Sequence, residues 1–318
     1  MGNFPIFVHP DCGDALEGCD FRKFLRGQNY TQKSVIATPG YFSIDLESGI
    51  RAEMTATEHV ALYRFSFESV PGHGKLHPVI QADGSDLLNS FGLRSMYVDA
   101  STGRMKGEGV FRPSFGQGSY QAYFCADFKG VQLSDVGAFN ETVLPEVNEA
   151  VSSHDYDGPL QGVYARFKDV KHGDHIMTRI GLSWLSTSRA CENGEHEVSD
   201  WDFERVHKEA VQAWRTKLEP IQVSTKDVSK KHLRNFWSGV YRAFLNPQDY
   251  TSENQLWNST EPYYDSWYCI WDTFRGVHPF LTLVDPISQS RMVRSLIDIF
   301  KHAGYLPEAS IVHSPRVT

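Results

Sequence analysis

The sequence lacks several features that would assign a function class directly. No run of about 18 apolar residues is present, so no membrane-spanning helix is predicted. Acidic residues (39) outnumber basic ones (31), and no basic cluster offsets the net charge of −8, which argues against a nucleic-acid or anionic-membrane surface. A G-x-S-x-G motif and a complete phosphate-binding loop are also missing. A neutral partner fits this pattern better.

Cysteine is sparse, and neither cysteine nor histidine forms a metal-binding motif. Two histidine pairs, His73 with His77 and His172 with His175, lack the further ligands that zinc requires. No C-x-x-C pair occurs, and an odd number of cysteines cannot pair completely, so we expect one bridge at most, between the first two cysteines. The five cysteines are Cys12, Cys19, Cys125, Cys191 and Cys269.

The N-terminal sequence MGNFPIFVHPDCGD lacks the basic and apolar regions of a signal peptide. The chain as written is therefore expected to be soluble and cytosolic, while secretion stays open for an intact form. Three N-x-S/T sequons, at Asn29, Asn140 and Asn258, would accept glycans only if the protein were secreted.

Residues 35 to about 185 predict strands. IRAEMTAT alternates Ile50, Ala52 and Met54 with charged or polar residues, the period of a half-buried strand. Turn signals separate further short runs, namely YFSIDL, VALYRFSF, SMYVDA, SYQAYFCADF, GVYARF and HIMTRIGLSW. Many short strands without intervening helices predict an antiparallel β-sandwich.

The pattern changes near Ser199. Residues 199–219 carry apolar residues at helical spacing, and Pro220 follows them, so they predict one amphipathic helix. Residues 228–245 predict a second helix, and a polar loop covers residues 246–266. The predicted fold class is thus a β-sandwich domain, residues 1–198, followed by an all-α region, residues 199–318.

The last predicted helix has clear end signals. Asp285 is suited to the N-cap, Pro286 to the first helical position and Gly304 to the C-terminal stop. The apolar stripes of these helices need partners. We expect those of the second helix, for example Leu233, Trp237 and Val240, to expose an apolar patch.

Residues 261–278, EPYYDSWYCIWDTFRGVH, interleave aromatic, acidic and basic side chains. Aromatic faces stack on sugars while carboxylates and arginine hydrogen-bond hydroxyl groups, so the mixture is typical of a saccharide pocket. Core packing is the alternative, and we favour it for Trp267 and Phe274. Asp272 and Arg275, three residues apart, either contact a ligand or form a surface ion pair worth less than ~1 kcal/mol.

The stretch WDTFRGVHPFLTLVDP, residues 271–286, with GYLP after the next helix, closely resembles the WDT-x-R...HP...TL...P segment of glycoside hydrolase family 92. ATPGYFSIDLESGIRAEMTAT and RIGLSWLSTSRACENGE resemble two upstream segments of that family. FWSGVYRAFLNPQDYTSEN fits its first barrel helices. The resemblance covers roughly residues 35 to 307.

This resemblance implies a calcium-dependent, exo-acting and inverting alpha-mannosidase. The family pairs an N-terminal β-sandwich with an (α/α)6 barrel, a six-hairpin toroid, and the sequence is expected to hold a sandwich incomplete at its start and the first barrel helices. A glutamic acid protonates the leaving oxygen, an aspartate activates water, and Ca2+ holds two hydroxyls of mannose. In the family, these carboxylates and the main calcium ligands lie in later barrel segments. No residue here is therefore assigned a catalytic or metal-binding role.

By the same resemblance, Trp271, Asp272 and Arg275 lie at the rim of the mannose subsite and are the predicted substrate-binding residues. Phe280, Leu281 and Leu283 are expected in the barrel core. The expected partners are mannose-containing glycans or glycoproteins, not nucleic acid or a membrane. We expect a fragment of an alpha-mannosidase, inactive or nearly so alone. The alternative is a non-catalytic glycan-binding or interaction module.

Overall fold

The computed structural model describes residues 3–13, 16, 18–68, 70, 74–84, 91–112, 119–140, 146–147, 160–267 and 269–307. The chain divides into two compact units. The first comprises Met1–Phe111 and Gln121–Trp214, and the second comprises Arg112–Tyr120 and Arg215–Thr318. The domain boundary predicted between residues 198 and 199 stays a prediction. No described helix has the length and apolar character needed to cross a membrane.

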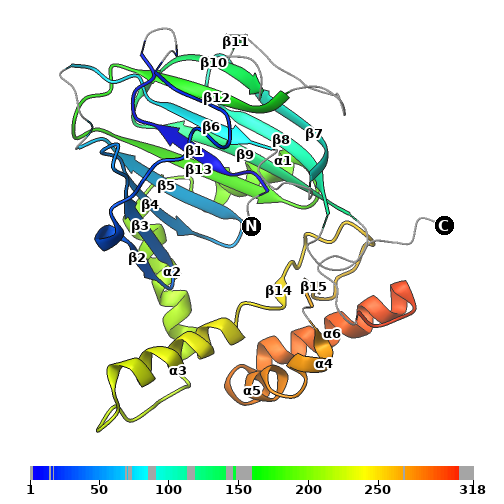
Figure 1. Cartoon of the computed structure of the whole chain (residues 1–318). Helices are drawn as coiled ribbons and strands as arrows, with labels where there is room; N and C mark the ends of the chain where they lie inside the picture. Colours follow the sequence, from blue (N-terminus) through cyan, green and yellow to red (C-terminus); the bar gives the residue numbers. More distant parts are fainter. Residues whose placement is uncertain are drawn as a thin grey trace. The chain divides into compact units, whose positions relative to one another are not determined.

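The first unit is an antiparallel β-sandwich (Figure 1). One sheet has the strand order β1-β6-β12-β10-β11, and the other has the order β2-β3-β4-β5-β13-β9-β8-β7. The strands are β1 Ile6–His9, β2 Ile36–Thr38, β3 Tyr41–Asp45, β4 Arg51–Ala56, β5 Val60–Ser66, β6 Val79–Asp83, β7 Phe91–Val98, β8 Met105–Phe111, β9 Tyr120–Lys129, β10 Gln132–Asn140, β11 Glu146–Val147, β12 Leu160–Lys168 and β13 His175–Ser183. Each predicted strand run contributes to one of them, so the predicted sandwich is confirmed.

The helices and the remaining short elements follow the sandwich along the chain. They are α1 Thr187–Glu197, α2 Phe203–Leu218, α3 Lys230–Ala243, β14 Gln248–Asp249, β15 Tyr264–Asp265, α4 Ile270–Thr273, α5 Val277–Val284 and α6 Pro286–Ala303, and a 3-10 turn lies earlier at Gln32–Ser34. The predicted order of sandwich first and helices second is confirmed.

Strand β4 has buried residues on both faces, so the prediction that its polar face is exposed is wrong. Glu53, on the face predicted to be polar, is only 7% exposed. Its carboxylate accepts hydrogen bonds from Arg64 Nε at 2.6 Å and from the Tyr41 hydroxyl at 2.8 Å. The Arg64 guanidinium lies over the ring of Phe203, at the start of α2, 4.3 Å from its centroid. The charge in the alternating pattern is thus part of an internal ion pair, not a solvent-facing side chain.

Helix α1 was not predicted, because it packs on β13 through small residues and lacks a large apolar stripe. Its buried residues are Ala190, Asn193 and Gly194. Opposite them, a Cβ on Gly181 would lie 1.9 Å from the Ala190 carbonyl oxygen. The amide of Asn193 donates to the Leu182 carbonyl oxygen at 2.9 Å. The helix therefore rests directly on the strand backbone.

The structure contains two disulfides, so the prediction of one bridge at most is wrong. Cys12–Cys19 is present as expected, and Cys125–Cys191 is the second. Cys125 pairs with Gly181 across the β9–β13 ladder, so the second bridge binds α1 to the sheet beside this glycine. It joins residues 66 positions apart, a separation with no local sequence signal. Closing a loop of this length stabilises a fold by roughly 2–4 kcal/mol.

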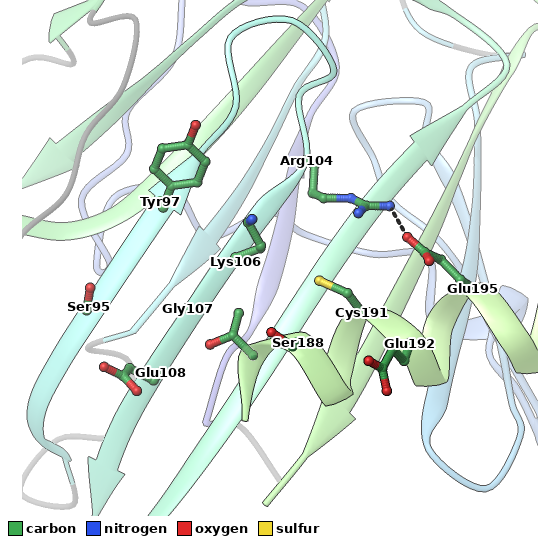
Figure 2. A pocket seen from close by; sticks show the side chains of 11 residues that line it. Ser95, Tyr97, Arg104, Lys106, Gly107, Glu108, Ser188, Cys191, Glu192 and Glu195 are labelled. Carbon is green, nitrogen blue, oxygen red and sulfur yellow. Dashed lines mark hydrogen bonds and ion pairs between the residues drawn. The ribbon is translucent and has the colours of Figure 1, made fainter. Parts of the chain in front are cut away.

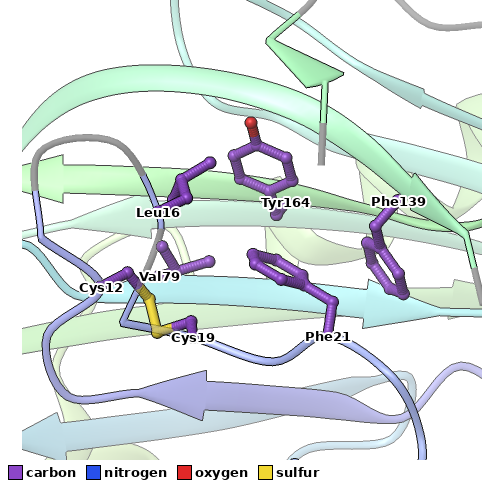
Figure 3. Close-up of a cluster of buried hydrophobic side chains, with 7 residues drawn as sticks. All are labelled: Cys12, Leu16, Cys19, Phe21, Val79, Phe139 and Tyr164. Carbon is purple, nitrogen blue, oxygen red and sulfur yellow. A yellow bond between two sulfur atoms is a disulfide. The ribbon is translucent and has the colours of Figure 1, made fainter. Parts of the chain in front are cut away.

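The Cys12–Cys19 loop covers part of one face of the five-stranded sheet (Figure 3). It forms a cluster of buried side chains, Cys12, Leu16, Cys19, Phe21, Val79, Phe139 and Tyr164. The disulfide closes this loop on itself, and apolar contacts hold it against the sheet.

The predicted helix ends are confirmed in one case and wrong in another. In α6, the Asp285 carboxylate accepts from the Ser288 backbone N–H at 3.2 Å, and Gly304 ends the helix with a left-handed φ of 79°. The helix predicted from Ser199 starts later, at Phe203, because the Asp202 carboxylate accepts from the Arg205 N–H.

The expected exposed stripe of the second helix is mostly covered. In α3, Val240 is buried, and Leu233 and Trp237 are half-buried. Phe236 of α3 is 42% exposed, and further exposed large apolar side chains belong to α5 and α6, namely Leu283, Ile287, Val293, Ile297 and Phe300. Leu283 is 83% exposed, so the prediction that it lies in a core is wrong for this chain.

The C-terminal end of α1 is held by Glu197. Its carboxylate lies 2.6 Å from His59 Nδ1 and also accepts from the Thr57 hydroxyl and the His59 backbone N–H. Burial acts to raise the pKa of Glu197, but these hydrogen bonds outweigh it and lower the pKa to about 2. The turn between β4 and β5 is thus attached to α1 by an ionised carboxylate.

Replacing Gly181 with alanine should destabilise the sandwich by about 3 kcal/mol, because the added methyl group would overlap the Ala190 carbonyl and force α1 from its seat. Urea unfolding would measure the loss. Gly27→Ala is the matched control, since nothing lies within 4 Å of its added methyl group, and it should change stability by less than ~0.5 kcal/mol. Equal effects of the two substitutions would contradict this packing.

Glu197→Gln should make the free energy of unfolding fall less steeply as the pH is lowered. The carboxyl titrates near 4.5 when unfolded and near 2 when folded, so its stabilising contribution is complete above about pH 4.5 and disappears as the pH falls toward 2. Urea midpoints measured from neutral pH into this window should fall more steeply for the native chain than for the variant. Glu58→Gln, in the same turn but exposed, should follow the native curve. Parallel native and Glu197→Gln curves would refute the assignment.

Candidate substrate-binding tract

The aromatic tract, residues 261–278, lies in the second unit and changes direction twice. It runs from β15 into the single turn of α4 and then into α5. Cys269 precedes α4 with a left-handed φ of 53°, and Gly276 precedes α5. Because α4 is so short, it places Trp271 and Asp272 on a bend of the chain.

The first half of the tract is core. Trp267 is 1% exposed and packs with Tyr264, Leu281 and Met292, so its predicted interior position is confirmed. Its indole N–H donates to the Tyr264 carbonyl oxygen at 3.0 Å. The Tyr264 N–H and the Ser295 hydroxyl of α6 are hydrogen-bonded at 2.8 Å. These contacts fix β15 against α6.

A buried polar pair lies beside this core. The Tyr263 hydroxyl donates to Asp265 Oδ2 at 3.0 Å, and the Ser266 backbone N–H donates to the other oxygen of the same carboxylate. Burial and the adjacent carboxylate raise the pKa of Tyr263 far above its usual value. Tyr263 therefore stays protonated and continues to donate its hydrogen bond.

A second polar contact ties β14 to α6. Arg291 Nη2 lies 2.8 Å from Asp249 Oδ2. Sequence reasoning missed both polar contacts. The Tyr263–Asp265 spacing of two residues on a strand is a usable signal, whereas Asp249 and Arg291 lie far apart in the chain.

The three predicted substrate-binding residues lie together on the exposed half of the tract. Trp271 is 53% exposed, and its indole N–H donates to Asp272 Oδ2 at 2.9 Å. Arg275 is paired with the other carboxylate oxygen of Asp272. The surface ion pair offered as an alternative is thus present. An indole face beside a carboxylate and a guanidinium can stack on a sugar and hydrogen-bond its hydroxyls. The substrate-binding role stays a prediction.

Phe274 is 60% exposed, so its predicted core position is wrong. The single turn of α4 directs it away from the Trp267 cluster. Tyr268 lies outside the described residues.

A pocket of about 630 Å³ opens elsewhere, in the first unit, between β7, β8 and α1 (Figure 2). Most of its lining residues are polar or charged, and Arg104 among them is paired with two carboxylates. Arg104 Nη2 lies 2.7 Å from Glu195 Oε1, and its Nε lies 2.5 Å from Asp127 Oδ1. Lys106 lies over the ring of Tyr97. None of the three predicted binding residues lines this pocket.

Among the described residues, no three carboxylates converge as they would around a metal ion. Calcium requires six to eight oxygen ligands. Among residues the structure describes, the one convergent group of three His, Cys, Asp or Glu side chains is His9, Cys12 and Cys19, and its two sulfurs are joined in a disulfide. Of the histidine pairs, His172 and His175 are exposed, and His73 lies outside the described residues.

Two family models match the chain. The glycosyl hydrolase family 92 N-terminal domain matches residues 1–183, more than half of the chain, and the glycosyl hydrolase family 92 catalytic domain matches residues 189–317. An uncharacterized secreted glycosidase of Arthroderma benhamiae is 41% identical over 283 residues, which are 86% of this chain and 37% of that protein. The chain thus spans little more than a third of this relative.

Solved structures of similar fold come from Bacteroides thetaiotaomicron. A family GH92 inverting mannosidase has a TM-score of 0.76 and 22% identity, covering 96% of this chain and 40% of its own. A GH92 alpha-mannosidase in complex with mannoimidazole has a TM-score of 0.74 and 18% identity, covering 98% and 41%. At these identities the likeness concerns the fold. With both domain models matched in order along the sequence, the chain belongs to glycosyl hydrolase family 92.

Proposed function

We propose that this chain supplies the sandwich and first barrel helices of an alpha-mannosidase that removes terminal alpha-linked mannose from glycans. The observation that carries the proposal is the exposed group Trp271, Asp272 and Arg275, set on a bend of a chain that belongs to family 92. The two similar solved structures described above support this proposal, since both are mannosidases and one is in complex with mannoimidazole.

In this proposal, the three exposed residues contact the sugar, and the buried part of the tract holds them in place. The Trp271 indole offers a face for stacking against the sugar ring. Asp272 accepts hydrogen bonds from sugar hydroxyls, and Arg275 orients its carboxylate. These contacts would bind and orient mannose. No described residue is assigned a proton transfer, and Ca2+ stays a prediction from the family resemblance.

We also propose secretion in place of the cytosolic location expected from the N-terminal sequence. Disulfides persist mainly in oxidising compartments, and this fold contains two of them. The relative named as a secreted glycosidase supports the same location.

Asp272→Asn should weaken binding of an alpha-linked mannobiose about tenfold or more, because a hydrogen bond to a charged acceptor contributes about 1.5–3 kcal/mol. Calorimetric titration of the 318-residue chain, with Ca2+ present, measures the affinity. Glu209→Gln is the matched control. It removes a carboxylate from another helical ion pair, with Arg205, and should leave affinity unchanged. Unchanged affinity in Asp272→Asn would remove the tract from the binding site.

The same chain should not turn over an aryl alpha-mannoside above background, since no described residue is assigned the acid or base role that normally contributes 10²- to 10⁴-fold. Binding without turnover also fits the second candidate, a non-catalytic glycan-binding module, for which the exposed tract is the supporting observation. Robust turnover that a chelator abolishes would refute both the inactivity and the module.

A further inference from the structure

The backbone at Asn29 is hydrogen-bonded to the sandwich, while the Asn29 side chain is exposed. The Asn29 carbonyl oxygen accepts from the Glu47 N–H at 2.9 Å, and the Thr31 N–H donates to the Asp45 carbonyl oxygen at 2.9 Å. Asn29 and Thr31, the first and third residues of the sequon, are both exposed. The structure gives no hydrogen bond to the side chain of either residue within the described part of the chain.

The surroundings of Asn29 favour a hydrophilic cover. The segment from residue 24 to residue 36 exposes five large apolar side chains, Phe24 at 79%, Leu25 at 58%, Tyr30 at 50%, Val35 at 38% and Ile36 at 45%. Exposed apolar surface promotes association unless something covers it. An attached oligosaccharide is bulky, strongly hydrated and located at the surface.

Asn258 follows a tryptophan that is fixed on α6. The Trp257 indole N–H donates to Asp298 Oδ2 at 2.9 Å, and its ring stacks on His302 with centroids 5.0 Å apart. Asn258 itself is exposed, as is Thr260, the hydroxyl residue of its sequon. Asn258 thus lies in a segment outside helix and strand, directly after a residue whose side chain is anchored.

We propose that Asn29 and Asn258 carry N-linked oligosaccharides. The proposal rests on the secretion proposed above and is independent of mannose binding. Each site combines an N-x-T sequon, two exposed side chains and a loop position, and the two disulfides fit the oxidising compartment in which such glycans are added. The native fold can hold a glycan at either asparagine without unburying its core. The third sequon is not included, because Thr142 lies outside the described residues.

The co-reactant is an oligosaccharide linked through pyrophosphate to a membrane lipid. The Asn amide nitrogen forms a bond to C1 of the first sugar, and the C1–oxygen bond to pyrophosphate breaks. The lipid pyrophosphate leaves with the bonding electrons, and one amide proton passes to a base of the transferase. The sequon hydroxyl, from Thr31 or Thr260, is the group the transferase requires at the third position.

Cell-free translation of the full chain behind a signal peptide, with endoplasmic-reticulum microsomes, tests the acceptor sites directly. Peptide mass spectrometry after enzymatic glycan removal in heavy-oxygen water should find Asn29 and Asn258 converted to labelled aspartate. Asn29→Gln and Asn258→Gln should each remove one glycan from the gel pattern.

Thr31→Ser and Thr260→Ser, which keep the sequons, should retain the glycans, whereas Thr31→Ala and Thr260→Ala should lose them. Unlabelled asparagine at both positions, with translocation shown by protease protection, would overturn the proposal. Because this assay uses a supplied signal peptide and no mannoside, its result is separate from those that test mannose binding and natural secretion.

Discussion

The course of the chain out of the sandwich depends on the close approach of α1 to the bare backbone of Gly181. No side chain larger than hydrogen fits there, because a Cβ would lie 1.9 Å from the Ala190 carbonyl oxygen. The Cys125–Cys191 bridge and the Glu197 hydrogen bonds hold the middle and the end of the same helix. The residues after α1 therefore start from a fixed position on the sheet.

Two arginines of the sheet contact the segment that follows α1. Arg179 donates to the Val198 carbonyl oxygen at 3.0 Å, pairs with Asp127 and lies over the ring of Trp201. Arg64 likewise holds the start of α2, because its guanidinium lies over the ring of Phe203. Buried ion pairs lose much of their Coulomb energy to desolvation, so these arginines contribute more to the path of the chain than to net stability. The charged residues of β5 and β13 therefore position the start of the helical region.

The aromatic tract shows how one composition divides into two roles. Trp267 and Trp271 are four residues apart, yet the first is 1% exposed and the second 53%. The left-handed turn at Cys269 and the single turn of α4 separate them, because they send the chain from the α6 contact to an exposed bend. A residue count of aromatics and acids predicts a sugar site for the whole segment. Among the residues of the tract that the structure describes, the exposed ones are Trp271, Asp272, Phe274, Arg275 and Gly276.

The sequence by itself determined the parts that local physics encodes. Period-two runs marked the strands, Asp285 and Gly304 marked the ends of α6, and motif order indicated family 92. Only the tertiary structure decided the contacts between distant residues. Helix α1 uses small residues and leaves no apolar periodicity, Cys125 meets Cys191 across 66 positions, and Glu53 is buried because Arg64 and Tyr41 satisfy it. Burial and pairing depend on which segments meet, and this information is not contained in any one stretch of the chain.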